Sequence, residues 1–125
     1  MQPKGRILVV EQNDLILRLL ERWLGEEGYT VVAGASQSAA QAVGEGGGPE
    51  LVIIDVPTPR SAENIIKSVR EVHASPILLL SARLFRRGTR SSISVARQLG
   101  VRNVLPKPFT RGELLSAVSE SIDGG

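Results

Sequence analysis

Polar and charged residues follow four apolar runs of the sequence, at the point where each run ends. Glu11 and Gln12 come after the first run, Asp55 ends the third, Ser81 ends the fourth, and Lys107 follows the fifth. Carboxylates can bind a hard cation or act as nucleophiles, and lysine supplies a positive charge. Taken singly, each residue is more often a helix cap, a loop residue or an exposed side chain. Their shared position at the ends of the runs is the stronger indication of chemistry.

Five apolar runs have the length of β-strands, and several are continuous rather than alternating. Continuous runs are typical of strands that are buried on both faces, as in parallel sheets. Segments with helical spacing separate the runs, so the order strand–helix repeats five times. With right-handed crossovers, this order predicts an α/β fold: a doubly wound, five-stranded parallel sheet with five helices on its two faces. The expected strands are 6–10, 30–34, 51–55, 76–80 and 101–105, and the expected helices are 14–27, 37–45, 61–73, one that ends near Leu99, and one from Thr110 to about Ile122.

In such a sheet, the residues at the ends of the apolar runs lie close together. The carboxyl ends of parallel strands lie at one edge, and ligands of open α/β sheets gather there. We therefore expect a carboxylate, a hydroxyl, an amine and a further acid to converge on that edge.

Capping residues mark the expected helix ends. Asn13 or Asp14 is expected to cap the first helix and Ser61 the third. Thr110, followed three residues later by Glu113, matches a capping box at the start of the last helix.

Helical spacing also predicts which side chains are buried. In the first helix, the apolar stripe consists of Ile16, Leu19, Leu20, Trp23 and Leu24. Trp23 is expected in the core and too far from the strand ends to report on them. His73, at the end of the third helix, is interpreted as a surface residue.

Length and composition limit the functions that the chain can have. A chain of 125 residues is expected to form one domain, over residues 1–125. It has no cysteine, so thiolate chemistry and disulfides are excluded. With one histidine and no cysteine, it cannot build a zinc site of the usual kind. Its N-terminal apolar run is too short for a signal peptide, and no run is long enough to span a bilayer. We expect a soluble, cytoplasmic protein.

The net charge of +2 conceals an uneven distribution. Residues 72–112 contain eight basic residues and no acid. Such asymmetry indicates either an anionic partner or simply a solvated face. The chain lacks an aromatic stacking pattern or a recognisable reading helix, so direct binding of nucleic acid is not expected.

The motifs ILVVEQ, LVIIDVPTP, PILLLSA and LPKPF stand in an order and spacing that resemble the receiver domain of two-component response regulators. The resemblance covers nearly the whole chain, and LPKPF together with the pattern from Asp55 to Pro59 is specific as a set. It implies a (βα)5 three-layer sandwich of the flavodoxin-like or CheY-like kind. It also implies a regulatory domain that at most catalyses its own phosphoryl transfer and dephosphorylation.

The resemblance implies a role for each run-end residue. Asp55 would accept a phosphoryl group from a histidine kinase, and the Ser81 hydroxyl would bond that group. Lys107 would pair first with the acceptor and then with the phosphoryl oxygens. Mg²⁺ would be held by Glu11, Gln12, Asp55 and the backbone carbonyl of Pro57. Phosphoryl transfer mostly needs positioning and charge neutralisation, so these residue types suit the chemistry.

Two departures weaken the resemblance to a working switch. Gln12 stands where the family usually has the acid that binds Mg²⁺ directly. An amide oxygen can still coordinate the ion but brings no charge, so we expect binding weakened by about tenfold or more. Val104 stands where the family usually has a Tyr or Phe that turns inward on activation.

A third departure is an insertion of some four residues between Ser81 and Gly100. The excess falls in RLFRRGTRSS, residues 83–92. Arg83, Arg86 and Arg87 are candidate contacts for an anion or a partner. The alternative is a flexible solvated loop.

Two functions remain open, and a small flavin or nucleotide binder is set aside. The first is a phospho-accepting receiver, with a histidine kinase or phosphotransfer protein upstream and an output domain or protein downstream. The second is a receiver-like interaction module that works without phosphorylation, through the basic face of the helix ending near Leu99 and the strand 101–105. No membrane partner is expected. A homodimer is compatible with the resemblance.

Overall fold

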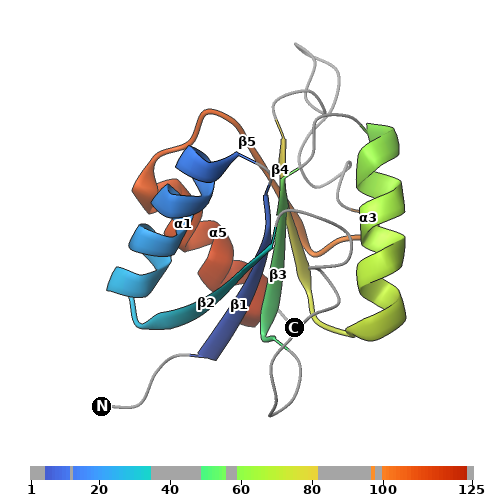
Figure 1. Ribbon diagram of the computed structural model, residues 1–125, viewed down its shortest axis with the longest axis horizontal. Helices are drawn as coiled ribbons and strands as arrows, with labels where there is room; N and C mark the ends of the chain where they lie inside the picture. Colours follow the sequence, from blue (N-terminus) through green and yellow to red (C-terminus); the bar gives the residue numbers. More distant parts are fainter. Residues whose placement is uncertain are drawn as a thin grey trace.

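The computed structural model describes residues 5–11, 13–34, 49–55, 59–81, 97 and 100–123. Its five strands form one parallel sheet in the order β2-β1-β3-β4-β5. Helices α1 and α5 lie on one face of the sheet and α3 on the other (Figure 1). The elements are β1 (Gly5–Val10), α1 (Asp14–Glu26), β2 (Tyr29–Gly34), β3 (Leu51–Asp55), α3 (Pro59–Val72), β4 (Ile77–Ser81), β5 (Asn103–Pro106) and α5 (Arg111–Asp123).

The expected fold class is confirmed: a five-stranded parallel sheet covered by helices on both faces. The last strand begins later than expected, at Asn103 rather than at residue 101. Two expected helices, 37–45 and the one ending near Leu99, lie outside the described residues. Within the described residues, no helix is long and apolar enough to cross a membrane.

The core has two layers, one on each face of the sheet. Alternate residues of β1 enter opposite layers: Leu8 and Val10 pack on the α3 side, and Ile7 and Val9 on the side of α1 and α5. All four are buried, which explains why the run is continuously apolar. Each such side chain contributes about 1.5–3 kcal/mol when it leaves water. The packed core on both faces therefore holds the sheet, and with it the ends of its strands, in a fixed position.

Local polar contacts fix the ends of the helices. Asn13, not Asp14, caps α1: its side chain accepts hydrogen bonds from the N–H groups of Leu15 and Ile16, at 2.9 and 3.2 Å. Helix α3 begins at Pro59, so the prediction that Ser61 caps it was wrong. Proline suits a first helical position because the N–H that it lacks would have no partner there.

The capping box of α5 is confirmed. Thr110 N donates to Glu113 Oε1 at 2.8 Å, and Glu113 N donates to Thr110 Oγ1 at 3.1 Å. Arg111 then ties the start of α5 to the end of α1, through ion pairs with Glu26 at 3.4 Å and Glu27 at 3.7 Å. These contacts hold the segment after β5 against α1.

Three predictions about burial need correction. Leu19 is 40% exposed, because α1 buries a narrower stripe centred on Leu20 and Leu24. Trp23 is only partly buried and packs on the edge of the core. His73 is buried rather than on the surface. It lies in the turn from α3 into β4, which Arg70 holds through the carbonyls of Ser75 and Gly100, at 2.7 and 3.1 Å.

Candidate functional site

The ends of four strands meet at one edge of the sheet. Residue pairing aligns Val10 of β1 with Ile54 of β3, and Ser81 of β4 with Pro106 of β5. Asp55 is therefore flanked by the residue that follows β1, which is Glu11, and by the end of β4. The expected convergence of Glu11, Asp55, Ser81 and Lys107 thus follows from the register of the backbone.

Asp55 and Lys107 form an ion pair between Oδ2 of the acid and Nζ of the amine. The Asp55 side chain is 7% exposed and that of Lys107 is 26% exposed. Asp55 Oδ2 makes no conventional hydrogen bond within the described residues, so the amine is its principal contact there.

Glu11 is the second carboxylate of this edge and is buried. Its Oε1 accepts a hydrogen bond from Asn13 N at 2.8 Å, so the residue that caps α1 also orients Glu11. Its Oε2 is buried without a hydrogen-bond partner among the described residues. Burial, followed by the interaction with the Asp55 carboxyl, raises the pKa of Glu11 to about 7.

These residues fit a divalent cation. Two buried carboxylates face the same edge, and one oxygen of Glu11 has no partner there. The Asp55 carboxyl raises the pKa of Glu11, and a cation bound beside the two carboxyls would offset this effect. Mg²⁺ commonly uses one or two carboxylates and completes its shell with waters and phosphate oxygens. Within the described residues, no group of three or more acids, histidines or cysteines is placed to hold a metal ion.

The segment after β5 positions Lys107. The Lys107–Pro108 peptide bond is cis, and Phe109 packs edge-on against Trp23 of α1, with ring centroids 6.4 Å apart and an interplanar angle of 65°. Lys107, Pro108, Phe109 and Trp23 line a hollow of about 350 Å³, together with Ile16 and Leu19. The expectation that Trp23 lies too far from the strand ends to report on them stays a prediction, although Trp23 packs on Phe109, two residues after Lys107. Helical periodicity predicts which face of α1 carries Trp23, but it does not predict that the segment after β5 packs on that face.

Several predicted site residues lie outside the described residues: Gln12, Pro57, Arg83, Arg86 and Arg87. Ser81 is described as the last residue of β4, which places its backbone at the site edge. Val104 is buried in the layer on the α3 side, where a valine fills the position of the family's usual aromatic residue.

Comparison with known proteins identifies the family to which this chain belongs. The response regulator receiver domain family matches residues 7–119, so this chain belongs to that family. The protein is a regulatory signalling domain of the receiver type.

Individual relatives agree with this assignment. The transcriptional regulatory protein PdtaR of Mycobacterium tuberculosis is 32% identical over 120 residues, which cover 94% of this chain and 56% of PdtaR. CpxR of Klebsiella pneumoniae is 28% identical over 115 residues, which cover 91% of this chain and 47% of CpxR. The chain thus spans about half the length of these curated relatives.

Solved structures share the fold. The receiver domain of the sensor histidine kinase PA1611 from Pseudomonas aeruginosa has a TM-score of 0.75 and 26% identity, covering 97% of this chain and 98% of that one. That structure holds a magnesium ion coordinated in its active site cleft. CheY4 of Vibrio cholerae has a TM-score of 0.74 at 22% identity, covering 97% and 99%.

Proposed function

We propose that this receiver domain is a phosphorylation switch and that Asp55 is its phosphoryl acceptor. The observation that carries the proposal is the ion pair between Asp55 and Lys107 at the carboxyl edge of the sheet, beside the buried Glu11. At this edge, Asp55 is the carboxylate that pairs with a lysine, Lys107. The flexible lysine side chain can pair first with the carboxylate and then with the oxygens of a phosphoryl group attached to it.

The transfer joins one Asp55 carboxylate oxygen to phosphorus and breaks the bond between phosphorus and the donor. The electron pair of the broken bond leaves with the donor, which is an imidazole nitrogen when the donor is a histidine kinase. The product is an acyl phosphate on Asp55. Lys107 neutralises charge on the phosphoryl oxygens, and the Ser81 hydroxyl donates a hydrogen bond to one of them.

Mg²⁺ is the proposed cofactor, held by Glu11 and Asp55 with the Gln12 side-chain oxygen and the Pro57 carbonyl. When bound, it supplies positive charge that neutralises the phosphoryl oxygens. The protein residues hold the acceptor in place: Asn13 orients Glu11, and β3 presents Asp55. Arg83, Arg86 and Arg87 are proposed as further contacts for an anion or a partner.

The proposed partners follow from the family. A histidine kinase or phosphotransfer protein supplies the phosphoryl group, and an output domain or protein reads the modified state. The relatives CpxR and PdtaR, which are about twice as long as this chain, are transcriptional regulatory proteins.

Intact-protein mass spectrometry after incubation with acetyl phosphate tests this function. We expect one phosphoryl adduct, which requires Mg²⁺ and disappears in Asp55→Asn. A Lys107→Met variant controls for the neighbouring amine and should be labelled more slowly. An adduct that persists in Asp55→Asn would refute the assignment of the acceptor.

A second function is favoured by Gln12, which replaces a charged metal ligand with an amide. In that case the domain is an interaction module that works without phosphorylation. It would then give no adduct at any Mg²⁺ concentration, whereas a weakened switch would be labelled when Mg²⁺ is raised.

A further inference from the structure

Asn13 lies between the proposed metal site and helix α1, and it makes hydrogen bonds in both directions. Its backbone N–H donates to Glu11 Oε1 at 2.8 Å. Its side-chain oxygen accepts from the N–H groups of Leu15 and Ile16, at 2.9 and 3.2 Å. Its carbonyl oxygen accepts from Leu17 N at 2.9 Å. One residue thus contacts a candidate metal ligand on one side and the first turn of the helix on the other.

The contacts with α1 determine the direction of the Asn13 N–H. Asn13 has an extended backbone, with φ −85° and ψ 114°, and it immediately precedes the helix. Its side-chain bonds to Leu15 and Ile16 occupy two of the N–H groups that the first turn of a helix leaves without a helical partner. When such a cap is lost, the first turn frays, and the peptide unit of Asn13 then loses its fixed orientation. The cap of α1 therefore holds in place the N–H that reaches Glu11.

The two oxygens of the Glu11 carboxyl have different surroundings. Oε1 accepts the Asn13 N–H, whereas Oε2 is buried and has no hydrogen-bond partner among the described residues. Within those residues, the structure gives this side chain no other hydrogen-bond donor. The terminal torsion of a glutamate has broad energy wells, so a single hydrogen bond can decide which oxygen faces the site. The Asn13 N–H therefore leaves Oε2 available to a cation.

We propose that Asn13 is a positioning residue that couples helix α1 to Mg²⁺ binding at Glu11. The cap holds the Asn13 N–H, that N–H holds the Glu11 carboxyl, and Oε2 of the carboxyl meets the cation. The coupling is reciprocal, so bound Mg²⁺ in turn stabilises the first turn of α1. The inference rests on the proposed metal site, and it assigns Asn13 no contact with the cation or with the phosphoryl group.

The Mg²⁺ affinity of Asn13 variants tests the coupling in one direction. Asn13→Ala removes the capping oxygen but keeps the N–H that contacts Glu11. Calorimetric titration should show that this variant binds Mg²⁺ about 2- to 30-fold more weakly, a range that corresponds to what a helix cap contributes to stability. Asn13→Ser keeps a capping oxygen and should bind Mg²⁺ as the parent does. All titrations use one pH and one ionic strength.

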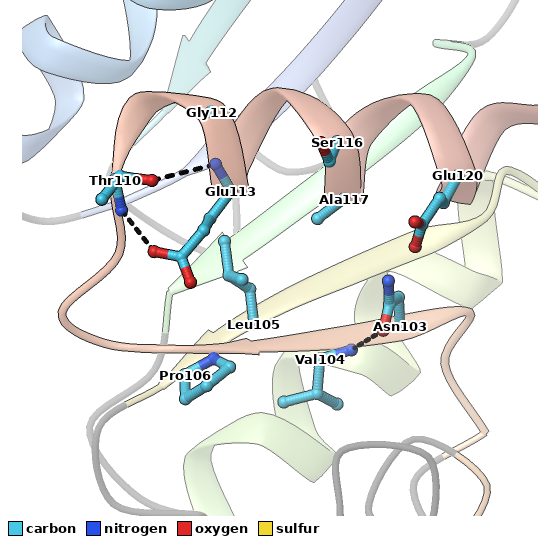
Figure 2. Close-up of a pocket in the computed structure, with 10 residues that line it drawn as sticks. All are labelled: Asn103, Val104, Leu105, Pro106, Thr110, Gly112, Glu113, Ser116, Ala117 and Glu120. Atoms are coloured by element: carbon cyan, nitrogen blue, oxygen red, sulfur yellow. Dashed lines mark hydrogen bonds between the residues drawn. The ribbon is translucent and has the colours of Figure 1, made fainter.

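Thr110→Ala is the matched control, because it removes the cap of a different helix. Thr110 Oγ1 accepts from Glu113 N at 3.1 Å and so caps α5, as Asn13 caps α1 (Figure 2). This variant should lose about as much free energy of unfolding as Asn13→Ala, yet keep the Mg²⁺ affinity of the parent. Urea unfolding measures the first quantity and calorimetry the second. A cap that acts only on stability would give both variants the same Mg²⁺ affinity.

Hydrogen exchange in the parent protein tests the coupling in the other direction and needs no variant. The amides of Leu15, Ile16 and Leu17 belong to the first turn of α1, and NMR can follow their exchange with solvent. Their exchange should slow by a similar factor, about 2- to 30-fold, when Mg²⁺ saturates the site. The amides of Glu113 and Leu114, at the capped start of α5, should exchange equally fast with and without Mg²⁺.

Three results would overturn the coupling while leaving the metal site in place. They are parent-like Mg²⁺ affinity in Asn13→Ala, equal losses of affinity in Asn13→Ala and in either Asn13→Ser or Thr110→Ala, and exchange of residues 15–17 that Mg²⁺ does not change. A parent protein that binds no Mg²⁺ would overturn the coupling together with the metal site. Labelling of that protein by acetyl phosphate then shows separately whether Asp55 still accepts a phosphoryl group.

Discussion

Phe109 meets Trp23 edge-on, and this contact joins the segment that carries Lys107 to helix α1. The single tryptophan of the chain therefore packs against the segment that follows Lys107.

Replacing Phe109 with Leu should lower the free energy of unfolding by about 0.5–1.5 kcal/mol, because an edge-on aromatic pair contributes that much beyond its buried area. The Trp23 emission should shift to longer wavelength as water reaches the ring. Urea unfolding followed by circular dichroism and fluorescence measures both effects. The control is Leu15→Ala, since Leu15 is 77% exposed and its removal should change little. Equal effects of the two substitutions would contradict the packing role of Phe109.

Replacing Lys107 with Met should leave the buried Asp55 carboxylate without its counter-charge. We expect the free energy of unfolding to fall by about 1–3 kcal/mol at neutral pH without metal, less than for a fully buried pair because Lys107 is partly exposed. Adding Asp55→Asn to Lys107→Met should recover most of that loss. A double-mutant cycle by denaturant unfolding measures the coupling. Simple additivity of the two substitutions would argue against a stabilising pair.

The raised pKa of Glu11 predicts how stability depends on pH in the absence of metal. Its pKa is about 7 in the folded protein and close to its ordinary value of 4.5 in the unfolded chain. Between these values, the folded protein holds a proton that the unfolded chain has released. Raising the pH through this window therefore lowers the free energy of unfolding, by at most about 1.4 kcal/mol per pH unit.

Urea unfolding between pH 5 and 8, in a chelator, measures this slope. Glu11→Gln should flatten it in that window, because the group that titrates is gone. Mg²⁺ should also reduce the fall, since it favours the ionised carboxyl. A slope that is identical in Glu11→Gln and the parent would show that another group is responsible.

Replacing Gln12 with Asp should strengthen Mg²⁺ binding by about tenfold or more, because it adds a charge directly after Glu11. Titration with Mg²⁺, followed by calorimetry, gives the two affinities. Gln12→Asn is the matched control, since it shortens the side chain without adding charge. Equal affinities for Asp and Asn at this position would exclude residue 12 as a ligand.

The sequence predicted the sheet well because continuous apolar runs and the order of elements determine a parallel sheet. The alignment of Glu11, Asp55 and Lys107 followed from that topology, since the strands deliver their ends to one edge. Contacts between distant segments were harder to predict. Periodicity places Trp23 and Leu19 on a face of α1, but it does not say how far the segment after β5 covers that face.

Burial of polar groups was missed for a related reason. His73 follows α3, where a surface position is usual, yet it is buried.

The ribosome also synthesises Asp55 and Lys107 at different times. β3 is synthesised in the first half of the chain, whereas Lys107 follows the last strand. During synthesis, the acceptor carboxylate therefore precedes its lysine, and the pair forms after the edge strand β5 has joined the sheet. A chain that stops before β5 has the acid and lacks its counter-ion, so the proposed switch becomes competent only after the segment that carries Lys107 has been synthesised.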